Sequence, residues 1–394
     1  MREGWKRVPL GDVLKLRTER SHSVKTLLSV TADRGVIPQS ESGRRDSSSA
    51  DKSLYWDVHP GDVVYNTMRM WQGVSGLADE GGIVSPAYTV CEPVEGTYNG
   101  FLRWLLKDPG LVAKFLNRSQ GLVSDTWNLK YSEFKKIEVT LPPLVEQQRI
   151  AEILHEVDTQ IQRSLIRQEK LQVVAAAETA ALMRSTSEGD SVEWTVLEEV
   201  AHISAGVTLG NDEAGDGATS LPYLRVANVQ DGYIDTSHVK TVAVRSCDVD
   251  RFSLAKGDVL LTEGGDLDKL GRGGVWDGRI NPCLHQNHVF KVRCRPAAYR
   301  PDFLASYLAS PRGKSYFLSV AKQTTNLASI NSSQVKKAPV PLVPLVEQDR
   351  IVASVAEWKE QLVSASREVE KLRLLRSALL DDLLTGKVRI PVNA

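Results

Sequence analysis

The sequence predicts an α+β protein in which a mixed globe followed by a long helix occurs twice. Residues 143–150 recur at 344–351 with seven of eight positions identical, and such a match within one chain marks an internal repeat. Each copy opens a long stretch of helical periodicity. In addition, 394 residues are too many for one ordinary hydrophobic core, so two globes fit the length.

The repeat divides the chain at the prolines before each long helix and at a polar linker near residue 190. We expect a first globe over residues 1–142, a central helix over 143–190, a second globe over 191–343 and a C-terminal helix over 344–394. Proline is tolerated at or just before the first turn of a helix, and both copies carry it there.

The two globes share short motifs although their sequences have diverged. Gly-Asp-Val occurs at 61–63 and again at 257–259, each time at the start of a β-branched run that is typical of a strand. Trp5 and Trp194 stand near the starts of the two globes. Helix-like stretches follow the strands in each half, so we expect α+β globes.

The long segments predict two helices that pair with each other as a coiled coil. Apolar residues recur at alternating spacings of four and three, which is the pattern of a coiled-coil seam, although Ser164, Gln168 and Glu178 interrupt it in the central helix. A helix of about 40 residues is roughly 60 Å long. The expected seam residues are Ile150, Leu154, Val157, Ile161, Leu171, Ile351, Val355, Trp358, Leu362, Val369, Leu372, Leu379 and Leu383.

Composition excludes several classes of protein. Lys and Arg together number 49, as do Asp and Glu, so any affinity for a polyanion must come from local basic faces. The longest nearly apolar stretch, 173–183, is too short to span a bilayer. Four scattered cysteines cannot staple a chain of this size, so we expect a reduced, cytoplasmic protein with no membrane association.

No motif for catalysis by this chain alone is evident. The phosphate-binding Gly-x4-Gly-Lys-Ser/Thr and the dinucleotide-binding Gly-x-Gly-x-x-Gly after a strand are both missing, and Asn281-Pro-Cys-Leu284 lacks the second proline and the aromatic residue of an adenine methyltransferase tetrad. Cys283, His285, His288 and Cys294 are residue types that bind zinc, but their spacing is not that of a standard finger. We therefore expect no catalytic residue and no metal.

Side chains suited to DNA binding recur at comparable places in both globes. Amide side chains can pair with adenine, and Arg and Lys can contact guanine or phosphate. Polar surface loops are common without any ligand, and the recurrence in two diverged globes is what favours a functional interpretation. The candidate DNA-binding residues are Asn66, Arg69, Trp71, Gln72, Tyr88, Lys135, Lys136, Lys269, Arg272, His285, Gln286, Asn287, His288, Gln323, Asn326, Lys336 and Lys337.

Taken together, these motifs resemble the specificity (S) subunit of type I restriction–modification enzymes. The resemblance covers essentially the whole chain. It rests on the duplicated Pro-Leu-x-Glu-Gln-x-x-Ile at the start of each long helix, on Trp5 and Trp194, on the Gly-Asp-Val strands, on His-Gln-Asn-His at 285–288 and on Leu-Leu-Asp-Asp-Leu-Leu-Thr-Gly at 379–386.

The resemblance implies that each globe is a target-recognition domain for one half of a split DNA site. It implies further that the two helices pack as an antiparallel coiled coil and set the gap between the half-sites. It also implies two methyltransferase (M) subunits that bind S-adenosylmethionine and methylate adenine at N6, and restriction (R) subunits, where present, that use ATP and Mg. The S subunit itself would bind no cofactor. Because Val84 to Tyr88 differs from Leu284 to His288, we expect an asymmetric site.

Two other classes of function stay open at this point. The first is a structural adaptor whose coiled coil assembles other proteins without reading DNA. The second is a stand-alone enzyme, which the missing motifs disfavour. Neither the recognised bases nor the presence of an R subunit follows from the residues.

Overall fold

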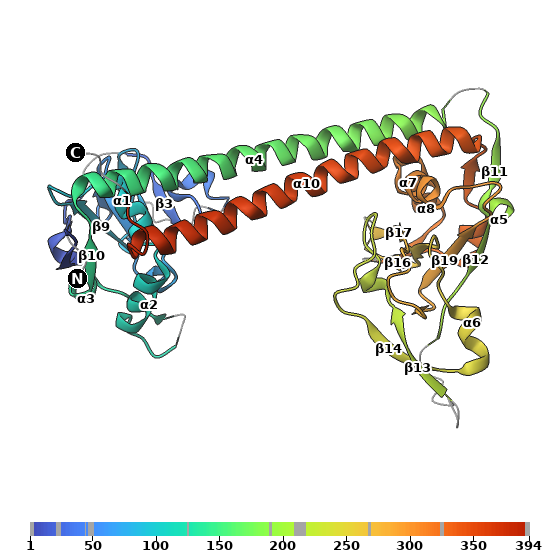
Figure 1. Cartoon of the computed structure of the whole chain (residues 1–394), viewed down its shortest axis with the longest axis horizontal. Coiled ribbons are helices and arrows are strands. Elements are labelled where there is room, and N and C mark those ends of the chain that lie inside the picture. Colours follow the sequence, from blue (N-terminus) through green and yellow to red (C-terminus); the bar gives the residue numbers. More distant parts are fainter. Residues whose placement is uncertain are drawn as a thin grey trace. The chain divides into compact units, whose positions relative to one another are not determined.

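The computed structural model describes residues 4–20, 25–43, 45, 51–123, 126–188, 191–208, 218–266, 269–323 and 327–390. It divides into two compact units: unit 1 comprises Met1–Ile166 and Ser366–Ala394, and unit 2 comprises Arg167–Ala365. Each unit combines one globe with part of both long helices (Figure 1). The predicted α+β class, with two globes and two long helices, is confirmed, whereas the compact units cut across the expected helical segments.

The two long helices are α4 (Leu144–Ser185) and α10 (Leu345–Leu384), and within each unit they run antiparallel. In unit 1, Arg376 pairs with Asp158 at 2.5 Å, and the Ser164 hydroxyl donates to Glu368 at 3.0 Å. Residue numbers therefore fall along α10 as they rise along α4. Among the helices described, none is long and apolar enough to cross a membrane.

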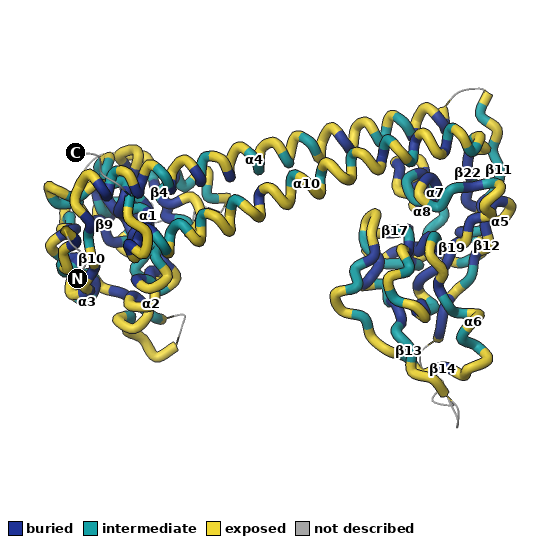
Figure 2. The backbone as a smooth tube through the Cα atoms, viewed as in Figure 1, coloured by how far each residue is buried: buried dark blue, intermediate teal, exposed yellow. Residues whose placement is uncertain are grey.

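The predicted seam residues lie on the inward faces of α4 and α10. In unit 2, Met183 shares a core with Ile351 and Val355, as expected for the same antiparallel register. Figure 2 shows buried and half-buried positions alternating with exposed ones along both helices. All of the predicted seam residues are buried or half-buried: Ile150, Leu154, Val157, Ile161, Leu171, Ile351, Val355, Trp358, Leu362, Val369, Leu372, Leu379 and Leu383.

The globe of unit 1 is built on a four-stranded antiparallel sheet in the order β2–β9–β6–β7. Its strands are β2 (Leu14–Leu16), β9 (Tyr88–Pro93), β6 (Val63–Asn66) and β7 (Ser75–Leu77). Three strand pairs accompany it: β1 (Lys6–Pro9) with β10 (Glu138–Leu141), β3 (Leu28–Thr31) with β4 (Gly35–Pro38), and β5 (Trp56–Val58) with β8 (Gly82–Val84). The helices are α1 (Asn99–Leu105), α2 (Pro109–Arg118) and α3 (Tyr131–Phe134), with short 3-10 turns at Leu10–Asp12, Gln39–Glu41 and Met70–Gln72.

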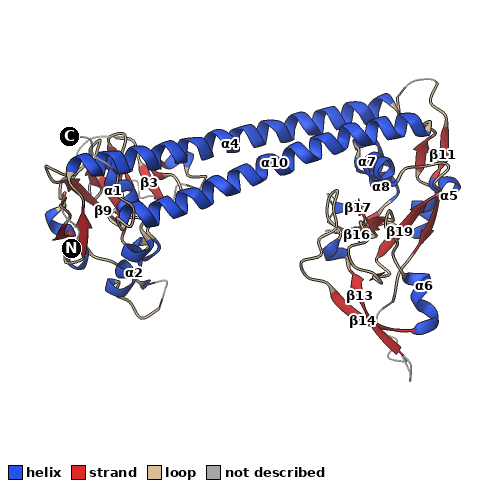
Figure 3. Cartoon of the chain, in the orientation of Figure 1, coloured by secondary structure: helices blue, strands red, loops and turns tan. Residues whose placement is uncertain are grey.

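The globe of unit 2 repeats this plan with extra strands (Figure 3). Its central antiparallel sheet has the order β12–β19–β15–β17, from β12 (Ala201–Ser204), β19 (Val289–Cys294), β15 (Val259–Thr262) and β17 (Gly273–Val275). A two-stranded sheet pairs β11 (Trp194–Val196) with β22 (Pro339–Pro341). A three-stranded sheet has the order β14 (Lys240–Arg245), β13 (Ala218–Leu224) and β18 (Leu284–His285). A second three-stranded sheet has the order β16 (Gly264–Gly265), β21 (Ala328–Ser329) and β20 (Lys322–Gln323). The helices are α5 (Leu197–Val200), α6 (Val249–Phe252), α7 (Pro301–Ala309), α8 (Pro311–Val320) and α9 (Ser332–Lys336), with 3-10 turns at Val226–Asn228 and Ser246–Asp248.

A buried glutamine fastens the first turn of each long helix to its globe. The Gln348 side chain accepts from the backbone N–H of Arg300 at 2.8 Å and donates to the carbonyls of Ala298 and Val343 at 3.0 and 2.7 Å. Gln147 repeats this arrangement in unit 1. A buried backbone group without a partner costs free energy, so these amides tie each globe to its helix.

The Gly-Asp-Val motif has a structural role in both globes. Asp62 and Asp258 are almost fully buried, and each receives two hydrogen bonds from one guanidinium, that of Arg17 at 2.8 and 3.0 Å and that of Arg293 at 2.7 Å twice. Each carboxylate also accepts a backbone N–H three residues upstream. The two arginines come from non-equivalent places: Arg293 lies in β19 of unit 2, and Arg17 directly follows β2 in unit 1.

We predict that Gln348→Ala destabilises the chain by about 2–3 kcal/mol, because it removes the partner of three partly buried backbone groups. The free energy of unfolding measured by urea denaturation tests this. Gln361→Ala is the matched control, since Gln361 lies exposed on the same helix, and it should change the free energy by less than about 0.5 kcal/mol. Equal effects of both substitutions would contradict the anchoring role.

Candidate nucleic-acid interface

In unit 1, three chain segments meet at the end of β6. The backbone N–H of Thr67 donates to Ala87 at 3.1 Å, and the N–H of Leu129 donates to Thr67 at 2.8 Å. The turn after β6, the turn before β9 and the hairpin after α2 are thereby joined. Loops held by a rigid sheet are common carriers of binding residues.

Unit 2 repeats the same junction at the end of β15. The N–H of Glu263 donates to His288 at 3.0 Å, and the N–H of Ile330 donates to Glu263 at 2.8 Å. We call the described residues of these segments the candidate interface: 66–72, 85–88 and 120–129 in unit 1, and 262–269, 286–289 and 322–330 in unit 2. Most of the predicted DNA-binding residues fall within it.

The candidate interface of unit 1 presents amide, guanidinium and aromatic groups. Asn66 accepts the N–H of Met68 through Oδ1 at 3.0 Å, and the Trp71 indole donates to the Met68 carbonyl at 3.1 Å. Trp71 packs edge-on against Trp127, with ring centroids 5.1 Å apart. Sequence reasoning did not single out Trp127, which becomes visible only through this contact. Arg69 and Gln72 are exposed, and the Tyr88 hydroxyl lies 3.4 Å from that of Ser29.

The candidate interface of unit 2 surrounds a cavity of about 550 Å³. Glu263 lies in its wall and contacts Nδ1 of His288 through a carboxylate oxygen, and Lys322 also lines the cavity. The cavity is lined by Val226, Glu263, Gly264, Gly265, His288, Lys322, Leu327, Ala328 and Ser329.

The structure also shows the burial and partners of the other residues predicted for this part of unit 2. Gln286 and Asn287 are half-buried, Gln323 is exposed in β20, and exposed Lys269 pairs with Asp266. Arg272 is half-buried, with its Nε buried and without a hydrogen-bond partner among the described residues. Asn326 lies outside the described residues.

His285 must be removed from the predicted DNA-binding set. Its side chain has no exposed surface, and its Nδ1 lies 2.8 Å from the carbonyl of Val289. Burial lowers the pKa of His285 to about 4, so the imidazole is neutral at physiological pH. The side chain therefore belongs to the core below the turn and cannot present a hydrogen-bonding edge to a base.

The correspondence between the two turns is also corrected by one residue. Ala87 and His288 occupy the same place in the two backbone junctions, and Tyr88 and Val289 begin the equivalent strands β9 and β19. Val84 is accordingly the counterpart of His285, and both are fully buried. The turns still differ in sequence after this correction. The expectation of an asymmetric site rests on that difference and is unchanged.

The duplicated lysine pairs lie where α3 and α9 lead into β10 and β22. The Lys135 carbonyl accepts the N–H of Gly11 at 3.0 Å, and Lys136 pairs with Glu133 at 2.6 Å. Lys337 is exposed and Lys336 half-buried at the equivalent place. None of the contacts found among the described residues joins these lysines to the candidate interface.

The four zinc-type residues of unit 2 do not come together as ligands. Burial raises the pKa of both Cys283 and Cys294 to about 12, so their thiols stay protonated, and His288 points instead to Glu263. Among the described residues, one group could hold an ion, formed by Glu19, Asp57 and His59 in unit 1, but Lys25 already pairs with Asp57 at 2.6 Å.

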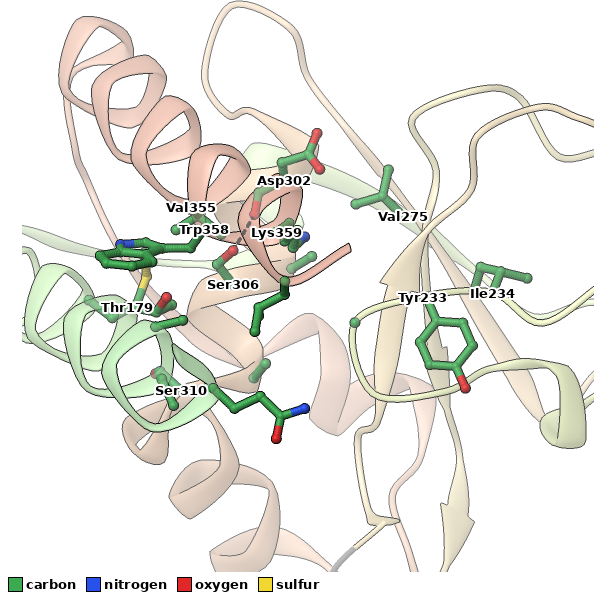
Figure 4. Close-up of a pocket in the computed structure, with 18 of the residues that line it drawn as sticks. Thr179, Tyr233, Ile234, Val275, Asp302, Ser306, Ser310, Val355, Trp358 and Lys359 are labelled. Atoms are coloured by element: carbon green, nitrogen blue, oxygen red, sulfur yellow. Dashed lines mark hydrogen bonds between the residues drawn. The ribbon is translucent and has the colours of Figure 1, made fainter. Parts of the chain in front are cut away.

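A second cavity, of about 990 Å³, lies in unit 2 between the long helices and the globe. In Figure 4, Trp358 and Thr179 lie on the helical side, and Tyr233 and Ile234 lie on the opposite side. It contains none of the predicted DNA-binding residues. Five alanines, at 175, 176, 180, 305 and 309, are among the residues that line it.

Three of the alanines that line this cavity have long polar counterparts in unit 1. Pro109 and Pro311 start the equivalent helices α2 and α8, and aligning them makes Arg103 and Lys107 the counterparts of Ala305 and Ala309. The offset between the long helices makes Arg376 the counterpart of Ala175. Arg376 pairs with Asp158, and Lys107 donates to the Ala32 carbonyl at 2.5 Å. Burial lowers the pKa of Lys107. Long polar side chains therefore stand in unit 1 at positions where unit 2 has alanines that line the cavity.

We predict that the free energy of unfolding of His285→Val falls less steeply on acidification than that of the wild type. Wild-type His285 stays neutral when folded down to about pH 4, whereas the unfolded chain takes up a proton near pH 6.5. Wild-type stability should thus fall between pH 6.5 and about 4 by an amount on the order of 2–3 kcal/mol that the variant lacks.

Urea denaturation at a series of pH values measures this difference. His202→Gln is the matched control, because His202 is exposed on β12 of the same globe, and it should keep the wild-type pH profile. A His285→Val profile parallel to the wild type would show that His285 is not the buried neutral group.

Comparisons with known proteins agree with this architecture. Residues 2–173 match the family model of the type I restriction modification DNA specificity domain. The specificity subunit of the type I restriction enzyme EcoKI from Escherichia coli strain K12 is 25% identical over 301 residues, which cover 72% of this chain and 62% of that protein. The alignments span between 40% and 62% of the length of the curated relatives matched.

Solved structures share the fold over nearly the whole chain. The HsdS subunit from Thermoanaerobacter tengcongensis matches with a TM-score of 0.56 at 18% identity, covering 98% of both chains. A chain from a structural study of complex assembly and conformational transition in the type I R-M system matches with a TM-score of 0.62 at 19% identity, covering 98% of this chain and 99% of that one. The predicted resemblance is confirmed: residues 2–173 match a type I restriction modification DNA specificity domain, and the chain has the fold of a type I specificity subunit.

Proposed function

We propose that this chain is the sequence-reading subunit of a type I restriction–modification complex. The observation that supports this most is the candidate interface, which occurs twice on equivalent backbone hydrogen bonds with different side chains. Two equivalent supports with different side chains suit two half-sites of different sequence. The target is therefore a bipartite, asymmetric duplex site.

The side chains of the candidate interface have the chemistry to distinguish bases. Asn66, Arg69 and Gln72 in unit 1 and Gln286 and Asn287 in unit 2 offer amides and a guanidinium, which pair with adenine and guanine edges in the major groove. The chain has no net positive charge, so phosphate contacts by partner subunits would supply much of the affinity.

In this proposal the partners carry the chemistry and this chain carries none. Two M subunits holding S-adenosylmethionine would methylate adenine at N6, and R subunits, where present, would use ATP and Mg. The long helices would set the gap between half-sites and provide docking surface. Both α4 and α10 contribute residues to both units, which supports a role in spacing.

Selection from a random pool of duplexes tests the proposal. The tagged chain, isolated with the subunits that co-purify from its own cells, should retain DNA with two conserved blocks separated by an unconserved gap. Arg69→Ala should change base frequencies in one block only and lower affinity for the selected site roughly tenfold. Retention without sequence preference would favour the structural adaptor instead.

We also predict that shortening both helices changes the gap. Deleting residues 163–169 together with 364–370 removes one heptad from each partner and keeps the seam in phase. Each helix loses about 10 Å, which corresponds to about three base pairs. The selected gap should shorten by about three base pairs, or binding should be lost.

Deleting residues 163–169 alone is the control, because it mismatches the two helices and should abolish binding whether or not they set the gap. An unchanged gap in the double deletion would contradict the spacing role.

A further inference from the structure

The internal repeat shows which side chains of the candidate interface the fold needs. Thr67 and Ala87 in unit 1 make the same backbone hydrogen bond as Glu263 and His288 in unit 2, at 3.1 and 3.0 Å. The junction therefore forms with a short hydroxyl and a methyl group as well as with a carboxylate and an imidazole. The Glu263–His288 pair is not required by the fold, and its presence calls for another explanation.

The pair is placed to meet a ligand. The Glu263 side chain is 31% exposed and that of His288 55%, and both line the cavity of about 550 Å³. Next to Glu263, β16 consists of two glycines, so bare backbone lies beside the carboxylate. A Cβ at Gly264 would lie 2.8 Å from the Ala328 carbonyl of β21, so this glycine is required by strand packing, and both glycines also line the cavity. Lys322 lines the same cavity and is exposed.

A carboxylate on a DNA-binding surface needs a specific reason, because it repels phosphate. The base-edge donors it can accept from in the major groove are exocyclic amino groups, above all N4 of cytosine. His288 lies against one side of the carboxylate through Nδ1, which orients it, and Lys322 offers a cation for a neighbouring phosphate.

We propose that Glu263, oriented by His288, is a specificity-determining residue that accepts a hydrogen bond from a cytosine amino group in the half-site contacted by unit 2. This inference rests on the proposed function and deepens it. Unit 1 has Thr67 and Ala87 at the same place, so this position supplies no carboxylate to its half-site.

Base selection by a Glu263→Gln variant tests this inference. The wild-type complex should require cytosine at one position of one block. Because glutamine pairs with the N6 and N7 groups of adenine, the variant should prefer adenine there, and its discrimination for cytosine should fall roughly tenfold or more. Removal of a negative charge should also strengthen retention of unrelated duplexes at low salt.

Two further variants separate recognition from damage to the fold. Glu198→Gln makes the same chemical change at an exposed position on α5 and should leave both blocks unchanged. His288→Ala keeps the carboxylate but removes its support, and it should weaken the cytosine preference without creating one for adenine. Thermal unfolding of all three variants should match the wild type.

Each outcome bears on a separate claim. Unaltered base frequencies for Glu263→Gln, or changes spread over both blocks, would overturn the role of Glu263 while leaving the proposed function intact. If the wild-type complex retains DNA without conserved blocks, the proposed function itself fails, and the inference fails with it.

Discussion

The attachment of each globe to the first turn of a long helix is the constraint on which the rest of the structure depends. Gln147 and Gln348 are almost fully buried, and their amides satisfy backbone groups on both sides of the junction. Neither Asn nor Glu could make the same hydrogen bonds, because the Asn side chain is too short and an ionised Glu side chain has no donor. A binding surface on a globe can be positioned by a helix only if this joint is rigid.

The repeat, the fold class and the seam could be predicted from sequence. They depend on the spacing of apolar residues and on residues that are identical in the two halves of the chain. Alternating spacings of four and three identify the inward face of a helix whatever it packs against. The glutamine of the Pro-Leu-Val-Glu-Gln motif was visible as a repeated residue, but its role was not, because its three partners lie in a loop about fifty residues upstream and in the turn just before the helix.

The candidate site was harder to predict because a turn's register decides which side chains face out. His285 lies in a polar run, yet it occupies the place of Val84 and is buried, while Gln286 and Asn287 are half-buried and His288 is exposed. A shift of one residue reverses the faces of a strand, and the local sequence carries no mark of that shift. The cavity between the helices and the globe of unit 2 was likewise hidden, since residues from α4, α7, α10 and the loops of the globe line it together.

The same backbone bonds that hold the candidate interface together also permit it to vary. Those of Thr67, Leu129, Glu263 and Ile330 join main-chain atoms only. The carboxylates beneath them, Asp62 and Asp258, hold their arginines from different strands, so even the buried ion pair is conserved in chemistry and not in position. Side chains on the outer face can therefore change without loss of the support. A repeat built this way keeps two supports alike while their binding surfaces diverge, which is what an asymmetric bipartite target requires.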